Sequence, residues 1–198
     1  MSHFNEVASE WDSAEKVEKM KKLADIVRPF LNDLRGKKIL DFGCGTGLFG
    51  FELVEEEGEI VGVDTSEGML KVFNKKGEGF PKVRSFNLDL ETEPLIEKFD
   101  VIVTSMAFHH LDNPKAMVAN FKEMLNPNGT LAVVDLDQED GTFHPDNGKM
   151  GVKHHGFSKE TLHSWAKNYG LAFEHHIINK IQKNEREYGQ FLALFRLL

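Results

Sequence analysis

The chain has 198 residues, 40% hydrophobic and 28% charged, a composition typical of one globular domain and not of a disordered chain. Its 24 lysine and arginine residues against 32 acidic residues give a net charge of −8, which argues against a bulk nucleic-acid partner. No apolar run approaches the ~18 residues of a membrane span. With Cys44 as the one cysteine, no intramolecular disulfide and no cysteine-based zinc cage can form.

The first predicted element is a helix over residues 13–34, with apolar positions spaced three and four apart. Asp12 followed by Glu15 has the form of its N-cap. Pro29 predicts a kink or break in its later part. From residue 37 the pattern alternates between apolar strands and helices. The predicted strands are 38–42, 59–64, 82–88, 99–106 and 130–135, and the predicted helices between them are 47–57, 66–76 and 113–125. The turn residues Asn-Pro-Asn-Gly, 126–129, are predicted to stop the last of these helices. Continuous apolar strands separated by helices predict a parallel sheet covered on both faces.

The segment 138–157 breaks this alternation, since it is rich in glycine, aspartate and histidine and has no period. Long irregular connections in compact domains often serve as lids or substrate loops. Regular structure is predicted to return with a helix over 158–169 and strands over 172–178 and 190–197. Residues 1–6 lack the basic and apolar regions of a signal peptide, so we expect a cytoplasmic protein.

A cluster of glycines follows the first parallel strand in the run Leu-Asp-Phe-Gly-Cys-Gly-Thr-Gly, residues 40–47. Glycines at this point allow a tight turn and a close approach of the backbone to a ligand. Asp41, Asp64 and Asp89 lie at or just after the carboxyl ends of three predicted strands. Open α/β sheets bind their ligands at this edge, so we expect the ligand site there.

Two nucleotide cofactors compete for this turn. The spacing of Gly45, Gly47 and Gly50 matches the dinucleotide fingerprint, which would make the chain an NAD-dependent oxidoreductase. Asp41, however, would point a negative charge at the turn that should hold a pyrophosphate. S-adenosylmethionine has no phosphate and carries an ammonium and a sulfonium, which a carboxylate suits. The charge at Asp41 therefore favours S-adenosylmethionine.

Several motifs in order resemble those of one family. Residues 40–47 resemble motif I of the class I S-adenosylmethionine-dependent methyltransferases, residues 61–70 their acidic loop, and residues 89–95 their adenine-contacting segment. Residues 99–131 are similar to the fourth and fifth strands of the ubiquinone/menaquinone-biosynthesis-like (type 11/12) branch, and the chain looks like a small bacterial or archaeal member. The resemblance implies an α/β, Rossmann-like, seven-stranded, mostly parallel sheet of order 3-2-1-4-5-7-6, with the last strand antiparallel and helices on both faces.

The resemblance also implies roles for individual residues. Asp41 would face the methionine ammonium, and Asp64 would bind both ribose hydroxyls. The methionine and ribose would be lined by three glycines of the turn, Gly43, Gly45 and Gly47. The remaining expected cofactor contacts are Thr65 and Met69 beside the adenine, Asp89 at its amino group, the Leu90 amide at a ring nitrogen, and Ser105 under the methionyl part.

Histidines supply the candidates for acceptor chemistry. Methyl transfer requires in-line geometry, and a base only if the acceptor must lose a proton. His109 and His110 follow the fourth predicted strand, so either could be that base, and either could instead order the loop through a hydrogen bond. His144 and His155 lie in the 138–157 segment, where they could line an acceptor pocket or remain solvated.

Trp11 precedes the first predicted helix, where it either staples that helix or closes over the cofactor, because aromatic faces favour cations. No metal ligands are predicted, since no histidines have the spacing of a metal-binding helix. Carboxylates at Asp135, Asp137 and Asp140 leave a divalent ion of the catechol-methyltransferase type open as an alternative.

The expected whole is a single domain that moves a methyl group from S-adenosylmethionine to a small-molecule acceptor, leaving S-adenosylhomocysteine. Within it we expect an N-terminal helical lid (1–35), a cofactor-binding core (37–137), an acceptor-side loop (138–157) and a C-terminal helix and strand pair (158–198). We expect a monomer or homodimer with no membrane partner. The alternatives are the NAD-dependent oxidoreductase and a non-catalytic module that binds S-adenosylmethionine.

Overall fold

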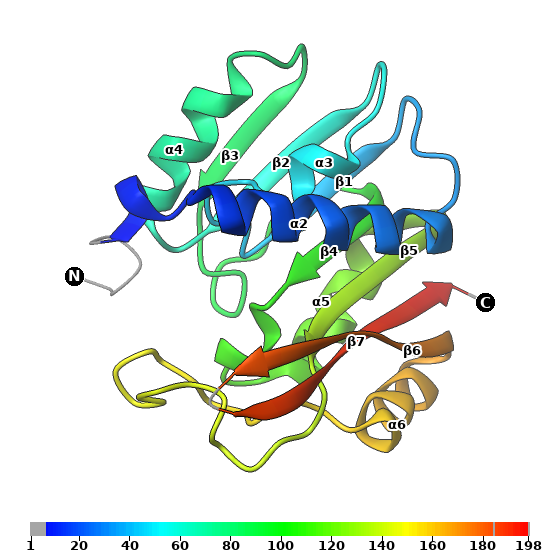
Figure 1. Ribbon diagram of the computed structural model, residues 1–198. Coiled ribbons are helices and arrows are strands. Elements are labelled where there is room, and N and C mark those ends of the chain that lie inside the picture. The colour runs from blue at the N-terminus through cyan, green and yellow to red at the C-terminus, as the bar shows by residue number, and fades with distance from the viewer. Residues whose placement is uncertain (1–6, 184, 198) are drawn as a thin grey trace.

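A computed structural model describes residues 7–183 and 185–197 (Figure 1). Its seven strands form one sheet of order β3-β2-β1-β4-β5-β7-β6, so the predicted fold class is confirmed. The strands are β1 Lys38–Phe42, β2 Glu59–Asp64, β3 Val83–Asn87, β4 Phe99–Ser105, β5 Leu125–Leu136, β6 Leu171–Lys183 and β7 Arg186–Leu197. The helices are η1 Ala8–Glu10, α2 Ala14–Val27, η2 Arg28–Phe30, α3 Gly50–Leu53, α4 Glu67–Gly77, η3 Phe108–His110, α5 Pro114–Met124 and α6 Lys159–Tyr169.

The sheet is parallel from β3 to β5, and β7 pairs antiparallel with both β5 and β6. In the register of the central strands, Leu40 lies opposite Val61 on β2 and Ile102 on β4. This pairing places the carboxyl ends of β1, β2 and β4 at one edge. Because β3 continues the same parallel arrangement, all the predicted acidic strand ends meet at that edge.

Two hydrophobic cores lie on opposite faces of the sheet. One contains α5 and α6 against alternate strand residues such as Leu40 and Val133, and the other contains α2 and α3 against the intervening residues such as Ile39 and Val134. A smaller cluster packs α4 against Ile60, which lies beside Ile39 in the register. The strands are apolar along their whole length because both faces are covered.

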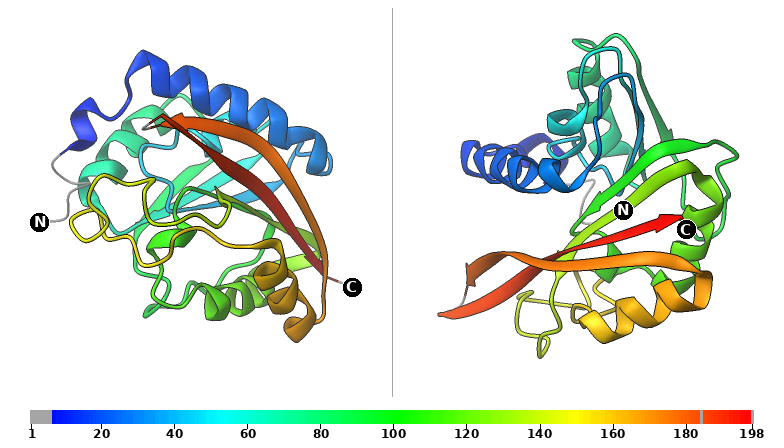
Figure 2. Two further views of the ribbon diagram at one scale, coloured as in Figure 1. Left: turned by 60° about the horizontal axis from the view of Figure 1, so that its bottom comes forward. Right: turned by 90° about the vertical axis from the view of Figure 1, so that its right-hand side faces the viewer.

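Figure 1 shows α2 crossing the front of the sheet, with α4 beside β3 at one end and α6 beside β6 at the other. Figure 2 shows β6 and β7 running on together as a curved two-stranded ribbon, with the 138–157 segment beside its tip. The ring of Phe143 in that segment lies 5.1 Å from the ring of Tyr188 at the start of β7. No helix among the described residues is long and apolar enough to span a membrane.

The first helix breaks near Pro29, as predicted: it ends at Val27 and continues only as a short 3-10 turn. Two other elements differ from the sequence-based predictions. The predicted helix over 47–57 shrinks to Gly50–Leu53, because the glycine turn occupies its first residues. The Asn-Pro-Asn-Gly stretch, predicted as a turn, is part of β5, with Asn128 in a left-handed conformation.

Ser13, and not Asp12, caps the first helix: the Ser13 side chain accepts a hydrogen bond from the Lys16 N–H. The prediction for Asp12 was therefore wrong, because its carboxylate is used in tertiary contacts. The division of the chain into lid, core, loop and C-terminal part stays a prediction, and residues 1–6, 184 and 198 lie outside the described residues.

Candidate functional site

A cavity of about 500 Å³ opens at the carboxyl ends of β1, β2 and β4, within the size range of small-molecule sites. The structure brings most of the predicted site residues together there. Those that line it are Trp11, Asp41, Gly43, Gly45, Asp64, Thr65, Met69, Asp89, Leu90, Ser105 and His110. The other four predicted residues, Gly47, His109, His144 and His155, do not line it.

The glycine turn forms the floor of the cavity. The N–H groups of Gly43 and Cys44 both donate to the carbonyl of Val63 on the neighbouring strand, at 2.8 and 3.1 Å. Gly43 has φ of +64°, and an added Cβ would lie 2.5 Å from the Cβ of Ala107. Glycine is therefore required here both by the backbone conformation and by the close approach of the segment after β4.

Asp41 is a buried carboxyl in the cavity wall, only 2% exposed, and its Oδ2 accepts no hydrogen bond from the described residues. Burial raises the pKa of Asp41 to about 8, the nearby Gly50 N–H opposes part of that shift, and the charge of Asp64 adds to it. A buried carboxyl with an oxygen that lacks a donor fits a cationic group, which would favour its charged form, whereas a phosphate would not. This geometry fits the ammonium of S-adenosylmethionine.

Asp64 ends β2, and its carboxylate is held by the backbone. Oδ2 accepts from the Gly45 N–H and Oδ1 accepts from the Ser66 N–H, both at 2.8 Å. Burial raises the pKa of Asp64, although these backbone N–H groups and that of Thr65 act in the opposite direction. A carboxylate offers about four lone-pair positions, so acceptor capacity is left for two hydroxyls of a ligand.

The adenine end predicted from the sequence lies in the same cavity. Met69 is buried on α4, whereas Thr65 and Asp89 are exposed at the rim. Asp89 Oδ1 accepts from the Glu91 N–H at 2.9 Å, which orients the carboxylate of Asp89 toward the loop that holds Leu90. This end of the cavity therefore has a buried apolar wall at Met69 and a polar rim at Thr65 and Asp89.

Ser105 ends β4 with its Oγ buried and without a hydrogen-bond partner among the described residues. The next residue, Met106, also lines the cavity and has φ of +57°, which is uncommon for a residue other than glycine. Its N–H donates to the Val134 carbonyl at 2.9 Å, which helps to hold this conformation. Backbone strain of this kind is found mostly at functional sites.

The adjacent histidines have different surroundings. The His109 Nδ1–H donates to Asp135 Oδ1 at 2.7 Å, and both side chains are buried, at 1% and 0% exposure. His110 reaches the cavity, and its Nδ1 bonds to the Gly151 carbonyl at 3.0 Å. Burial, and after it the neighbouring His109, lowers the pKa of His110. His110 is therefore the neutral imidazole at the cavity, and His109 anchors the loop behind it.

The 138–157 segment folds over these histidines. The His109 carbonyl accepts from the N–H groups of both Lys153 and His154. The His144 ring lies 5.0 Å from the His109 ring, and burial, followed by the nearby His109, lowers the pKa of His144 to about 4. His155 lies farther out, half exposed, with Nδ1 3.6 Å from Glu139. His144 therefore lies close to the histidines after β4, but both His144 and His155 lie outside the cavity.

The N-terminal segment closes one side of the cavity through Trp11, Lys16 and Met20. Asp12 fastens this segment: its Oδ1 accepts from the Thr46 hydroxyl at 2.6 Å, and its Oδ2 lies 2.5 Å from Lys76 Nζ. Lys76 also donates to the Thr46 carbonyl at 3.0 Å. The position of Trp11 agrees with closure over the ligand.

The carboxylates after β5 do not converge. Asp135 accepts a hydrogen bond from His109, and Asp140 forms an ion pair with Arg186 at 2.8 Å. Across residues 7–183 and 185–197, no group of three or more metal-ligating side chains is arranged to hold an ion.

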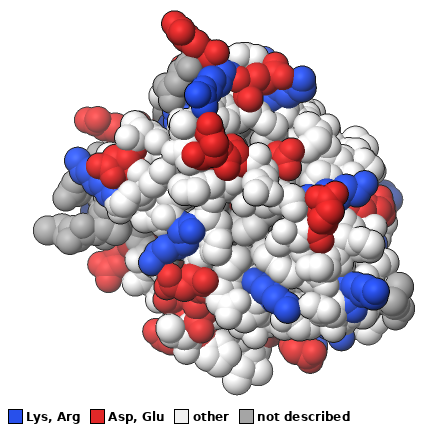
Figure 3. Space-filling view, turned by 90° about the horizontal axis from the view of Figure 1, so that it is seen from below, with Lys and Arg blue, Asp and Glu red and all other residues white. Residues whose placement is uncertain are grey.

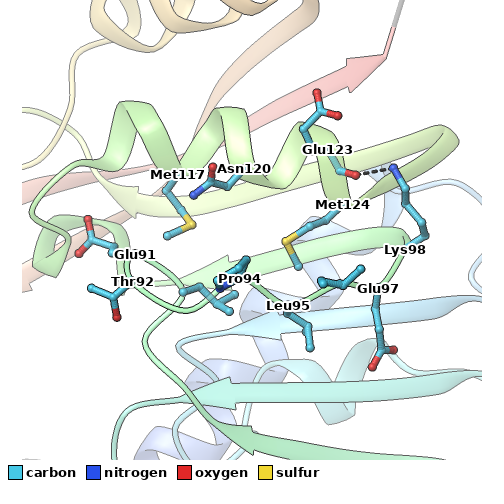
Figure 4. Close-up of a pocket in the computed structure, with 12 residues that line it drawn as sticks. Glu91, Thr92, Pro94, Leu95, Glu97, Lys98, Met117, Asn120, Glu123 and Met124 are labelled. Carbon is cyan, nitrogen blue, oxygen red and sulfur yellow. Dashed lines mark hydrogen bonds between the residues drawn. The ribbon is translucent and has the colours of Figure 1, made fainter.

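A second hollow of about 470 Å³ lies between α5 and the segment before β4 (Figure 4). In Figure 4, Met117 and Met124 point from α5 toward Pro94 and Leu95. It shares only Leu90 and Glu91 with the first cavity and contains neither the glycine turn nor a histidine. The first cavity is therefore the candidate site.

The face in Figure 3 carries acidic and basic side chains interspersed around uncharged surface, with no continuous basic area. Proteins that bind bulk nucleic acid cluster lysine and arginine on one face. The visible face lacks that feature.

Three residues of this region were missed as site elements from the sequence. Asp12 was interpreted as a helix cap and Asp135 only as a candidate metal ligand, and Lys16 was not singled out. For Lys16 the helical spacing was a usable signal, since it lies four residues before Met20 on the inward side of α2.

Comparison with known proteins gives a consistent family. Residues 40–131 match the model of a methyltransferase domain. An uncharacterized methyltransferase of Schizosaccharomyces pombe is 38% identical over 165 residues, 75% of this chain and 58% of that protein. The malonyl-[acyl-carrier protein] O-methyltransferase of Halalkalibacterium halodurans is 32% identical over 156 residues, 73% of this chain and 54% of that protein. The chain thus spans little more than half the length of these curated relatives.

Among solved structures, a Haloferax volcanii methyltransferase in complex with the Trm112 methyltransferase activator superposes with a TM-score of 0.76 at 14% identity, covering 99% of this chain and 98% of that one. A Mesorhizobium loti S-adenosylmethionine-dependent methyltransferase gives 0.72 at 18% identity, covering 91% and 100%. At these identities the likeness shows the fold, which agrees with the family match.

Proposed function

Because this chain belongs to the class I S-adenosylmethionine-dependent methyltransferases of the type 11/12 branch, we propose that it transfers a methyl group from S-adenosylmethionine to a small-molecule acceptor. The observation that carries the proposal is the cavity at the strand ends, where Asp41 Oδ2 and Ser105 Oγ are buried without hydrogen-bond partners among the described residues. Buried polar atoms are nearly always satisfied, and because these two residues line the cavity, a ligand that enters it can supply the donors.

All of the predicted cofactor contacts except Gly47 line this cavity, which supports the following arrangement of the cofactor. Asp41 receives the ammonium, and the turn at Gly43 and Gly45 passes under the methionine and ribose. Asp64, with two acceptor positions left, takes the ribose hydroxyls. The adenine lies between Met69 and the rim, where it meets Thr65, Asp89 and the Leu90 amide. Gly47 acts one step away, since its N–H donates to the Cys44 carbonyl and shapes the turn.

Bound S-adenosylmethionine supplies a sulfonium methyl group that an acceptor can attack in line. The protein's task is to orient the acceptor and exclude water. Trp11 covers one side, and Met106 and His110 line the side near the end of β4. His110, held neutral by burial, accepts the proton of an acceptor that must lose one, while the bond from His109 to Asp135 holds the loop in place.

The acceptor side comprises His110 and the 138–157 segment, with His144 and His155 as outer residues of that segment beyond the cavity. We propose a small acceptor because the cavity holds about 500 Å³ in all, much of which the cofactor takes. We also propose a monomer or homodimer. A cytoplasmic location is supported by the single cysteine, which leaves no disulfide framework. An NAD-dependent oxidoreductase is disfavoured by the buried carboxyl of Asp41 at the turn.

Calorimetric titration with S-adenosylhomocysteine and with NAD tests the cofactor. We expect binding of the first and none of the second, and the reverse result would contradict the proposal. Release of S-adenosylhomocysteine from S-adenosylmethionine across a panel of phenols, amines, thiols and carboxylic acids then tests catalysis. Tight cofactor binding without release over the whole panel would identify the non-catalytic module instead.

A further inference from the structure

Lys16 is the only lysine or arginine among the described residues that line the cavity. The other charged side chains of the lining are carboxylates: Asp41, Asp64, Asp89, Glu91 and Asp112. A single cation among five carboxylates is the feature of the cavity that the cofactor contacts above leave unexplained.

The position of Lys16 on α2 is also unusual. The inward side of this helix continues through Met20, which lines the cavity, to the buried Leu23, Ala24 and Val27. Lys16 lies on that side, half-buried, whereas the neighbouring Lys19 is exposed and paired with Glu15 at 2.6 Å. An ammonium is strongly hydrated, so placing a lysine on an inward face costs desolvation free energy unless a partner there binds the charge.

Among the described residues, Lys16 has an aromatic contact but no carboxylate partner. Its Nζ lies 3.3 Å from the centroid of the Trp11 ring, and no ion pair joins it to any described carboxylate. Asp12 attracts it only at a distance, because both Asp12 oxygens are occupied by Thr46 and Lys76. The same Asp12 contacts fasten the segment, so Trp11 and Lys16 are held at the cavity wall.

We propose that Lys16 is the carboxylate-binding residue of this cavity, donating an N–H from Nζ to a ligand carboxylate while the Trp11 ring holds the ammonium in place. This inference rests on the proposed function, since S-adenosylmethionine carries an α-carboxylate beside the ammonium that Asp41 receives. An acceptor that bears a carboxylate offers the same chemistry. In this arrangement Asp41 faces the ammonium of the ligand, and Lys16 faces the carboxylate of the ligand.

The test compares Lys16→Met with Lys19→Met, the same change on the outward side of the same helix. Each variant is titrated calorimetrically with S-adenosylhomocysteine, which has the amino-acid part, and with 5′-methylthioadenosine, which lacks it. If the carboxylate is the cofactor's, Lys16→Met weakens S-adenosylhomocysteine binding by about 10-fold and leaves 5′-methylthioadenosine unchanged. Lys19→Met changes neither, and thermal melting of both variants checks that they fold.

A second arm separates the other source. If the carboxylate belongs to the acceptor, S-adenosylhomocysteine binding is unchanged, but benzoate binding to the protein saturated with S-adenosylhomocysteine is lost in Lys16→Met and kept in Lys19→Met. An equal loss for S-adenosylhomocysteine and 5′-methylthioadenosine, or no loss for any of the three ligands, overturns the inference alone. A wild-type protein that binds neither nucleoside overturns the proposed function, and this inference with it.

Discussion

The buried carboxyl of Asp41 predicts that cofactor binding releases a proton. With a pKa of about 8, Asp41 is protonated in about 0.9 of free molecules at pH 7. An ammonium placed against its unpartnered Oδ2 favours the charged form and lowers that pKa. If the pKa in the complex falls to about 6, occupancy by the proton falls to about 0.1, so about 0.8 protons leave per molecule bound.

The same shift makes the stability of the free protein depend on pH. The pKa of Asp41 rises from 3.8 to about 8 on folding, so its contribution to stability is full below pH 3.8 and is lost as the pH rises through 8. Between pH 5 and pH 8 this contribution falls by about 4 kcal/mol. Asp41→Asn cannot ionise, so its free energy of unfolding should fall less than that of the wild type over this range.

The assay is calorimetric titration with S-adenosylhomocysteine at pH 7 in phosphate and in Tris, whose ionisation enthalpies differ. The dependence of the binding enthalpy on the buffer gives the number of protons released. The 5′-methylthioadenosine control has no ammonium and should release none, and Asp41→Asn should release none with either ligand. Tight binding of S-adenosylhomocysteine without proton release, or equal release with both ligands, would refute the placement of the ammonium at Asp41.

Three further predictions concern single residues. Asp64→Ala removes the acceptor of two backbone N–H groups at 2.8 Å and should weaken S-adenosylhomocysteine binding by about 100-fold; unchanged affinity in calorimetry would dismiss Asp64 as the ribose ligand. Both Asp135 oxygens accept from His109, one from its ring N–H and one from its backbone N–H, so Asp135→Asn places a donor NH2 against one of these donors and should lower the free energy of unfolding in urea by about 2 kcal/mol; a loss below about 0.5 kcal/mol would contradict a structural role. Gly47→Ala, with φ of +81° and its new Cβ 2.4 Å from an aromatic carbon, should cost about 2 kcal/mol in the same assay; wild-type stability would contradict the strain at that position.

The features that the sequence predicts well are those encoded by neighbouring residues. A strand such as Ile60 to Val63 is apolar throughout because both of its faces are covered, and this shows in the residues themselves. The acidic strand ends at Asp41 and Asp64 follow from strand position alone, since the ends of parallel strands meet at one edge. The parallel sheet follows from these local runs, and its strand order, which the resemblance to the methyltransferase family implied, was predicted correctly. The ligand site at this edge stays a prediction.

The roles of His109 and His110 required the tertiary structure. They are adjacent in sequence and chemically identical, but their surroundings differ. His109 is hydrogen-bonded to Asp135, 26 residues later in the chain, whereas His110 lines the cavity. Side chains on successive residues of a short turn point in different directions, and only the packed neighbours decide which one is buried.

Asp12 and Lys16 make the same point at the N-terminus. The local pattern predicts Asp12 as a helix cap. In the folded protein its carboxylate instead bonds to the Thr46 hydroxyl and pairs with Lys76, two residues that lie far from it in the sequence. Helical periodicity indicates that Lys16 lies on the inward side of α2. Only the folded structure shows that it is the one cation among the described lining residues of a cavity whose other charged groups are carboxylates. The sequence by itself determined the strands and their acidic ends, because these depend on local apolar runs, and the order of the sheet followed from the family resemblance. The tertiary structure alone decided which charged and titratable groups face the ligand, because their partners lie far away along the chain.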